Sequence, residues 1–302
     1  MYYPYLRGRQ YELIGLRELC DKNLLTNVIP ILEPVKASAT LLNTIQSFKK
    51  NNITIILIQN PSVGTFLNDL EYDKDFKLKF LNLLDNCKDN IINGYIINSK
   101  INKKNITIPS TAFCLNMDDV QILNDLSLPF EYSFIPDSSS AKRKIKGKKI
   151  LFEDRFDLKP RNVDYADNVD TFFSNDLFYY QDEQFDGFSD FSIVGKEYNE
   201  SGFAPFAVAI HIIYKGNIDD ELRIHHFVSN SNEDINNPQK KFAEALDKLV
   251  NFKFLNNEQN QTLALNYFFD LHKNESYPGL GTVKKLSIMH HIELVSKILS
   301  TL

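Results

Sequence analysis

Polar residues follow several short apolar stretches of this sequence, and their types suit acid–base chemistry or anion binding. They are Glu33, Lys36, Gln59, Asn60, Asn98, Asp154, Arg155 and Asp190. A carboxylate in such a position acts as a general acid or base or binds a divalent ion, whereas a lysine or arginine holds a phosphate or a carboxylate. We therefore treat the five charged residues as catalytic candidates and the three amides as ligand-binding candidates. The alternative is structural, with Glu33 and Lys36, and likewise Asp154 and Arg155, forming ion pairs and caps.

The stretch from Val28 to Lys36 places the first of these groups. Four apolar residues around Pro30 predict a short buried strand. Pro34 pushes the residue before it, Glu33, into an extended conformation, so that the carboxylate projects at the carboxyl end of the strand. The carboxyl ends of parallel strands are where α/β folds place their sites. We expect a site mouth there.

A glycine-containing turn precedes the last helical segment and contributes Gly281, Thr282 and Lys284. Free amides at a helix N-terminus favour anions, and barrels often bind phosphate near their last loops. These three residues are therefore further ligand-binding candidates. The alternative is a turn followed by a threonine N-cap.

Two basic groups are candidates for contact with nucleic acid. One lies in residues 142–149, where six of eight residues are basic, and includes Lys142, Arg143 and Lys144. The other is Arg7 with Arg9, which stand among tyrosines that can stack on bases. The alternatives are a solvated helix end for the first group and packing of a terminal segment for the second.

The histidines predict no metal site. His225 and His226 are neighbours on an expected strand, so their side chains point to opposite faces. His290 and His291 lie about 100° apart around an expected helix and fail likewise. His211 stands among apolar residues, where a core histidine is expected. The sequence leaves the cofactor open.

Apolar stretches alternate with helical ones through the first half of the chain. Strands are expected at 28–33, 53–58, 93–97, 110–114, 131–135 and 149–153. A helix at 9–22 precedes the first of them, where it could plug one end of a barrel. The alternation predicts parallel βαβ units, and six units in about 155 residues are too many for a small open sheet. We predict an α/β fold, a distorted TIM-like (β/α)8 barrel.

The pattern changes after residue 155. Residues 164–174 predict a helix, and 188–194 a seventh strand. Two strands at 207–214 and 222–228, joined by a turn, predict an antiparallel hairpin near strands seven and eight. Its second strand could serve as strand eight. Extra helices are expected at 238–254, 258–273 and 282–299.

Length and composition are those of a globular protein, with 302 residues, 43% hydrophobic and 24% charged. We expect one domain over 1–302, with an N-terminal segment and helix at 1–22, a barrel at 23–255 and C-terminal helices at 256–302. The net charge of −5 argues against general attraction to nucleic acid. Three separated cysteines, no signal peptide and no bilayer-length apolar run predict a cytoplasmic protein without membrane contact. The oligomeric state is open.

Seven runs that together span most of the chain carry a family resemblance. They are residues 2–13, 29–36, 59–64, 187–195, 207–211, 222–230 and 277–291. These runs resemble the bacterial beta-protein family, most closely its branch of about this chain's length found near phage-defence genes. The resemblance implies a barrel-like fold and a small nuclease-like companion encoded nearby. It implies no reaction and no catalytic residues.

Two functions follow from these observations. The first is a phage-defence component, a binding or sensor module that acts with a nuclease-like partner. The alternative is a TIM-barrel enzyme that acts on a phosphorylated or nucleotide-like small molecule through the strand-end carboxylates. An open cleft with these groups close together favours the enzyme, whereas a filled barrel mouth with paired charges favours the binding module.

Overall fold

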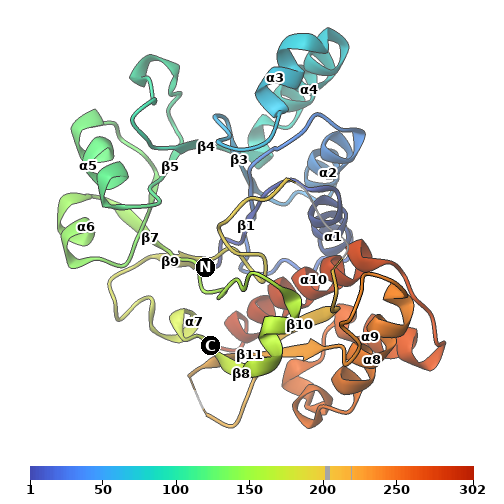
Figure 1. The fold of residues 1–302 in the computed structure, drawn as a ribbon. Helices are drawn as coiled ribbons and strands as arrows, with labels where there is room; N and C mark the ends of the chain where they lie inside the picture. The colour runs from blue at the N-terminus through green and yellow to red at the C-terminus, as the bar shows by residue number, and fades with distance from the viewer. Residues whose placement is uncertain (201–204, 219) are drawn as a thin grey trace. The chain divides into compact units, whose positions relative to one another are not determined.

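The computed structural model describes residues 1–200, 205–218 and 220–302 and divides into two compact units (Figure 1). The first comprises Met1–Asp154 and Tyr179–Phe191, and we call it the barrel unit. The second comprises Arg155–Phe178 and Ser192–Leu302, and we call it the sheet unit. The single domain over residues 1–302 stays a prediction.

The barrel unit contains an eight-stranded, entirely parallel sheet in the order β1-β2-β3-β4-β5-β6-β7-β9. The strands are β1 (Tyr5–Leu6), β2 (Ile31–Leu32), β3 (Ile55–Ile58), β4 (Ile91–Ile96), β5 (Thr111–Phe113), β6 (Tyr132–Ile135), β7 (Lys148–Phe152) and β9 (Gly187–Ser189). The helices between them are α1 (Gln10–Asp21), α2 (Ala39–Lys50), α3 (Phe66–Tyr72), α4 (Lys74–Asn86), α5 (Met117–Leu126) and α6 (Ser139–Lys144). They lie outside the ring of strands in Figure 1. The predicted distorted TIM-like barrel is confirmed.

The N-terminal segment closes the ring. Tyr2 forms parallel bridges with both Val28 and Phe188, and the Tyr3 N–H donates to the Phe188 carbonyl at 2.9 Å. The helix expected at 9–22 was predicted to precede the first strand. That prediction was wrong, because β1 lies before α1, and α1 packs against α2. A strand of two residues beside Pro4 carries no alternating pattern, so the sequence did not reveal it.

Aromatic rings fill the barrel. Phe113 stacks on Phe134 with ring centroids 4.2 Å apart, and Phe152 stacks on Phe191 at 5.0 Å. Tyr5 contacts both Phe152 and Phe191. Burying each such ring contributes about 1.5–3 kcal/mol, so the barrel interior is a packed core.

Side-chain caps fix where several helices of this unit begin. The Ser38 hydroxyl accepts from the Leu41 N–H before α2, and the Asp73 carboxylate accepts from the Phe76 N–H before α4. The Asn116 side chain caps α5 in the same way. Such caps satisfy backbone donors that have no partner inside the helix.

The sheet unit is built on an antiparallel sheet in the order β10-β11-β8. Its strands are β10 (Ala209–Lys215), β11 (Leu222–Val228) and β8 (Asp170–Ser174). The predicted hairpin is present, but β11 pairs with β10 and β8 and is not barrel strand eight. Residues 164–174 are also not one helix, because a 3-10 helix, η3 (Asn162–Asp167), precedes β8.

The C-terminal helices belong to the sheet unit. They are α8 (Pro238–Val250), α9 (Leu263–Lys273) and α10 (Leu280–Leu299), while α7 (Asp176–Tyr179) is a short turn of helix after β8. Helix α10 packs against β10 and α9, and thirteen of its twenty residues are buried. In the described part of the chain, no helix has the length and apolar character needed to cross a bilayer.

Candidate functional site

The predicted strand-end residues of the barrel unit lie at the carboxyl ends of its strands. Glu33 follows β2, Asn60 follows β3, Asn98 follows β4, Asp154 follows β7 and Asp190 follows β9. Because neighbouring strands of this sheet are parallel, these positions share one end of the barrel. We call that end the rim.

The Glu33 carboxylate is buried at the rim and is 1% exposed. Its Oε1 accepts from the Ser62 N–H at 2.7 Å and from the Ser62 hydroxyl at 2.8 Å. Its Oε2 accepts from the Tyr5 hydroxyl at 2.8 Å and pairs with Arg7 Nε at 3.5 Å. The cation beside Glu33 is therefore Arg7 and not Lys36, which is exposed.

Burial, and secondarily the negative charge of Glu33, raises the pKa of Tyr5 well above its ordinary value. The phenol therefore stays protonated and donates its hydrogen to the carboxylate. The Arg7 side chain is 12% exposed, and its guanidinium carbon lies 5.5 Å from the centre of the Phe191 ring. This is the terminal-segment packing that we gave as the alternative to nucleic-acid contact. Arg9 is the N-cap residue of α1.

The loop after β3 packs onto the backbone after β2. The Thr65 N–H donates to the Val35 carbonyl at 2.8 Å. Gly64 has φ +78°, and a Cβ there would collide with the same carbonyl. The Asn60 amide bonds both backbone groups of Ile96, with its Nδ2 at 2.8 Å from the carbonyl oxygen and its Oδ1 at 2.9 Å from the nitrogen. These contacts give the loop a structural role.

Three other predicted residues at this end also make local contacts. The Gln59 side chain donates to the Leu57 carbonyl, and the Asn98 side chain accepts from the Lys100 N–H. Asp190 accepts from the Tyr2 hydroxyl at 2.7 Å. Burial, followed by the charge of Asp190, raises the pKa of Tyr2.

The Arg155 guanidinium pairs with Asp176, a residue that the sequence did not suggest as its partner. Arg155 belongs to the sheet unit, where its guanidinium makes two 2.7 Å bonds to the two oxygens of Asp176. Such bidentate pairs have a fixed geometry, which orients the guanidinium on α7. Asp154 is the last residue of the first barrel segment and is half-buried.

The glycine turn before α10 differs from the predicted cap. The helix begins at Leu280 after Gly279, so Gly281, Thr282 and Lys284 lie within its first turns. Thr282 is therefore not the N-cap residue, and Gly279, with φ +85°, occupies that position. Phosphate binding there stays a prediction.

The predicted basic group at 142–149 includes the end of α6. Lys142 Nζ lies 2.9 Å from Asp137 Oδ1 and 4.4 Å from the centre of the Phe185 ring. The Lys144 ammonium donates to the Gln121 side chain, and Arg143 is exposed. Two of the three side chains thus have partners inside the barrel unit.

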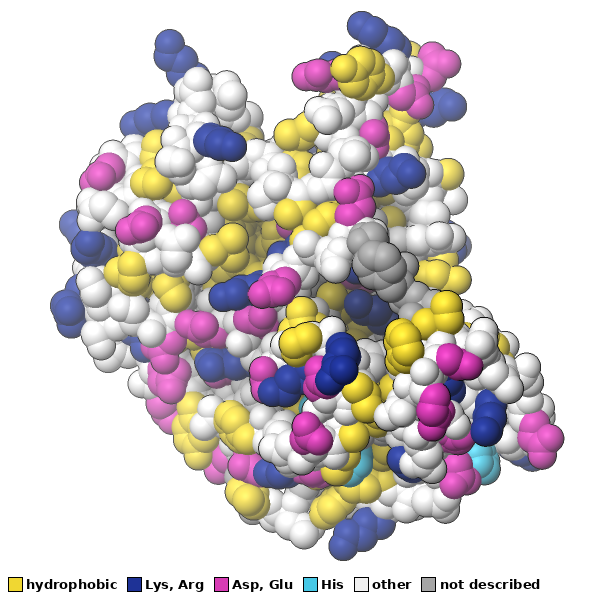
Figure 2. Space-filling model, viewed as in Figure 1, with side chains coloured by type: hydrophobic (Ala, Val, Ile, Leu, Met, Phe, Trp, Pro, Cys, Tyr) yellow, Lys and Arg dark blue, Asp and Glu magenta, His cyan; other side chains and the backbone are white. Residues whose placement is uncertain are grey.

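Helices α3 and α4 expose four large apolar side chains. Tyr72 is 86% exposed, Leu78 61%, Leu81 51% and Leu67 47%. We call these four residues the α3–α4 face. At the top of the view in Figure 2, apolar side chains lie among acidic and basic ones over these helices. The helices are held by Phe66, Phe76 and Phe80, whose rings pack together on the buried side.

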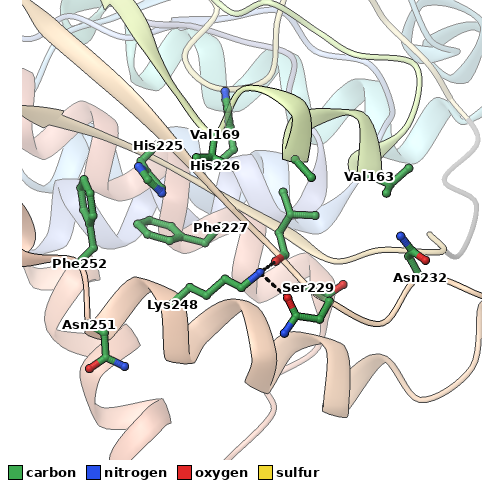
Figure 3. A pocket seen from close by; sticks show the side chains of 13 residues that line it. Val163, Val169, His225, His226, Phe227, Ser229, Asn232, Lys248, Asn251 and Phe252 are labelled. Carbon is green, nitrogen blue, oxygen red and sulfur yellow. Dashed lines mark hydrogen bonds between the residues drawn. The ribbon is translucent and has the colours of Figure 1, made fainter.

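A cavity of about 570 Å³ lies in the sheet unit, beside the part of β11 that extends beyond Asp170, the first residue of β8 (Figure 3). Its lining includes Val169, from the segment before β8, and Lys248, from α8, while His225 and Phe227 come from β11. Lys248 Nζ donates to the Val228 carbonyl at 2.6 Å and to the Asn230 side chain at 2.7 Å.

A carboxylate network stands behind this cavity. Asp170 of β8 accepts from the Tyr214 hydroxyl at 2.6 Å and from Arg223 Nε at 2.8 Å. Its Oδ2 lies 2.9 Å from His225 Nδ1. Burial acts to raise the pKa of Asp170, but the hydrogen bonds from Tyr214, His225 and Arg223 outweigh it and lower that pKa. An ionised Asp170 therefore orients the His225 ring.

His226 faces the other side of β11 and pairs with His211. The two Nδ1 atoms are 2.8 Å apart, so one nitrogen donates and the other accepts. Burial lowers the pKa of both rings, that of His226 to about 4. The predicted opposite orientation of His225 and His226 is confirmed. No group of three or more potential metal ligands occurs among the described residues.

The sequence reading missed the Asp170 network because it assigned residues 164–174 to a helix. One signal was present. Pairing the two strands across the turn places Tyr214 opposite Arg223, and side-chain alternation then puts His225 on the same face. The third strand, which brings Asp170, carries no such signal.

Comparison with known proteins adds no assignment: no family model, no curated protein and no solved structure matches this chain.

Proposed function

We propose that this protein is a phage-defence component, a binding or sensor module that acts with a nuclease-like partner. The family resemblance supports the defence context and the kind of partner. The observation that carries the binding role is the α3–α4 face. Large apolar side chains exposed on two helices that contact each other are typical of a surface for association.

The composition of this face suits a protein partner. Tyr72 supplies a ring with a polar tip, and Leu78 and Leu81 lie one turn apart on α4. Exposed charges of both signs lie beside them in the sequence, at Lys74, Asp75, Lys77 and Lys79. Interfaces combine an apolar centre with a polar rim in this way, and tyrosine is enriched there. We propose that the nuclease-like companion covers this face.

The alternative, a TIM-barrel enzyme that uses strand-end carboxylates on a phosphorylated or nucleotide-like molecule, has weaker support. Glu33 is buried, accepts hydrogen bonds from Tyr5 and Ser62, and forms an ion pair with Arg7. A general acid or base must reach its substrate within hydrogen-bonding distance. If Glu33→Gln with Asp154→Asn abolished biological activity in a folded protein, the enzyme would become the better proposal.

The test is capture of the companion encoded by the neighbouring gene, using the full chain as bait. We expect the native protein to retain the companion and Leu78→Asp with Leu81→Asp to lose it. Leu115→Asp is the matched control, because Leu115 is also in the barrel unit and is similarly exposed, at 47%. Capture by the double variant equal to that of the native protein would move the interface elsewhere. No capture by the native protein, with no change in phage resistance on deletion, would overturn the proposal.

A further inference from the structure

We propose that the cavity beside His225 binds a small planar heteroaromatic molecule, neutral or anionic, of nucleobase or nucleotide type. This site lies wholly in the sheet unit and is independent of the α3–α4 face. A cavity of about 570 Å³ falls in the range of small-molecule sites. Four features of its lining select the ligand.

The first feature is a hydrogen-bond acceptor fixed in place. Since the Asp170 carboxylate can only accept, His225 Nδ1 must donate to it. In the neutral ring Nε2 then carries the lone pair, and it makes no hydrogen bond within the described residues. His225 lines the cavity (Figure 3). The site therefore presents an acceptor to an N–H or O–H donor of the ligand.

The second feature is a wall of rings. The His225 ring lies 4.2 Å from the Phe252 ring and 4.4 Å from the Phe227 ring, centre to centre. Phe227 and Phe252 are themselves 5.5 Å apart. Aromatic faces favour planar partners, and stacking of a base on such a ring contributes about 1–3 kcal/mol. A planar ligand therefore makes the most extensive contact with these rings.

The third feature is charge. Lys248 is the only ionised side chain among the lining residues, which include no carboxylate. Its ammonium has three donors, of which two are used by Val228 and Asn230. The remaining donor suits a carbonyl or phosphate oxygen. A cationic ligand gains nothing here, whereas a neutral or anionic one does.

The fourth feature is two amide side chains in the lining, which suit the polar edges of a heterocycle. The Asn232 amide lines the cavity and makes no side-chain hydrogen bond within the described residues. Asn251 uses its Nδ2 on the Asp247 carbonyl, which leaves its Oδ1 as an acceptor. Amides that both donate and accept read the mixed donor and acceptor edge of a nucleobase.

The experiment titrates the purified full chain by calorimetry with adenosine, guanosine, cytidine and uridine and with their 5′-monophosphates. We expect at least one of these probes to bind. His225→Phe keeps a ring but removes the acceptor. We expect affinity to fall about tenfold, which is the change expected from the loss of one hydrogen bond. Lys248→Met should weaken monophosphates more than nucleosides. His272→Phe, on α9 and outside the cavity, is the control and should bind as the native protein does.

If His225→Phe does not fold, Asn232→Leu supplies the second test, because it removes a lining amide without touching the Asp170 network. We expect it to abolish binding of the probe. The proposal is overturned if none of the eight probes binds the folded native protein. It is also overturned if a folded His225→Phe, or Asn232→Leu, binds the probe with native affinity. Capture of the companion protein does not enter this test, so the two proposals fail separately.

Discussion

The two units each place a carboxylate among a tyrosine and an arginine, but they use the arrangement differently. In the barrel unit Glu33 is 1% exposed, accepts hydrogen bonds from Tyr5 and Ser62, and forms an ion pair with Arg7. In the sheet unit the Asp170 side chain is 27% exposed, and one of its partners, His225, has a second ring nitrogen and lines a cavity. We call the first network closed, because both oxygens of its carboxylate have partners within the chain. We call the second network open, because one ring nitrogen of His225 is available to a ligand.

This difference shows that residue types alone do not distinguish a structural carboxylate from one that prepares a ligand-binding site. A buried carboxylate whose oxygens all have partners holds loops together, and it cannot approach a substrate without breaking those bonds. A carboxylate that fixes a histidine ring leaves the other ring nitrogen for a ligand. The number of partners and the presence of a cavity therefore separate the two roles.

The largest expected effect is on the closed network. Glu33→Ala removes the carboxylate that accepts from the Tyr5 hydroxyl and pairs with Arg7, and breaking a buried pair in this way costs about 3–5 kcal/mol. We expect this loss in the free energy of unfolding from urea denaturation followed by circular dichroism. Lys36→Ala is the control, because Lys36 is exposed and should change stability by less than about 0.5 kcal/mol. Equal stability of Glu33→Ala and the native protein would mean that the rim network does not hold the barrel.

The fold of the barrel unit could be predicted because its strands are short apolar runs separated by helical periodicity. Strands expected at 53–58, 131–135 and 149–153 match β3, β6 and β7 closely. Strand β1 could not be predicted, because two residues carry no period. Strand β11 was placed in the wrong sheet, since alternation gives the faces of a strand but not its neighbours.

For the candidate site, the sequence predicted which residues lie at strand ends but not which residues they contact. Glu33 is at a strand end, as Pro34 indicated, but its partner Arg7 is 26 residues away in sequence and no spacing connects them. Asp170 and His225 are 55 residues apart. Such pairs arise from tertiary packing, which one sequence does not encode in a local pattern.

A second prediction extends the contrast to histidines. His290 on α10 is a closed histidine, because Nδ1 is 2.7 Å from the Thr262 hydroxyl and Nε2 is 2.8 Å from the Ile213 carbonyl. Burial lowers its pKa to about 4. The folded state then binds fewer protons than the unfolded state below the ordinary histidine pKa of about 6.5, so stability is full above that pH and falls toward pH 4, by at most about 3 kcal/mol.

The measurement is the free energy of unfolding of the full chain at several pH values between 7 and 4.5, for native protein and His290→Gln. We expect a smaller pH slope in the variant, because one buried neutral histidine has been removed. His272→Gln, at an exposed position of α9, serves as the control and should keep the native slope. An unchanged slope in His290→Gln would show that other groups carry the acid sensitivity.

A third prediction makes the same change in each network. Tyr5→Phe and Tyr214→Phe each remove one hydroxyl donor to a carboxylate. Glu33 is buried, so the loss costs about 1–3 kcal/mol, whereas water can replace the donor at the partly exposed Asp170 and the cost there is about 1 kcal/mol. Thermal unfolding of the two variants checks the order. A larger loss for Tyr214→Phe would reverse the assignment of closed and open networks.

Tyr214→Phe should also shift an acid transition. The lowered pKa of Asp170 means that its contribution to stability is present above the ordinary aspartate pKa and is lost as pH falls through the folded value. Removing the Tyr214 donor raises the folded pKa, so the loss should be smaller in total and should be complete at a higher pH, as measured by urea denaturation at several pH values. Arg223, His225 and the cavity residue Lys248 are the other charged or titratable groups around the carboxylate and its ring, and they are unchanged in this variant.

The smallest expected effect on stability is at the α3–α4 face. Leu78→Asp with Leu81→Asp changes two exposed side chains, and such surface substitutions usually stay within about 0.5 kcal/mol of the native free energy of unfolding. Phe76→Ala on the same helix removes a buried ring and should cost about 3–5 kcal/mol. Urea denaturation of the two variants tests this ordering. A surface that can be made acidic without loss of stability is available for a partner, whereas a large loss in the double variant would show that Leu78 and Leu81 already pack within the chain.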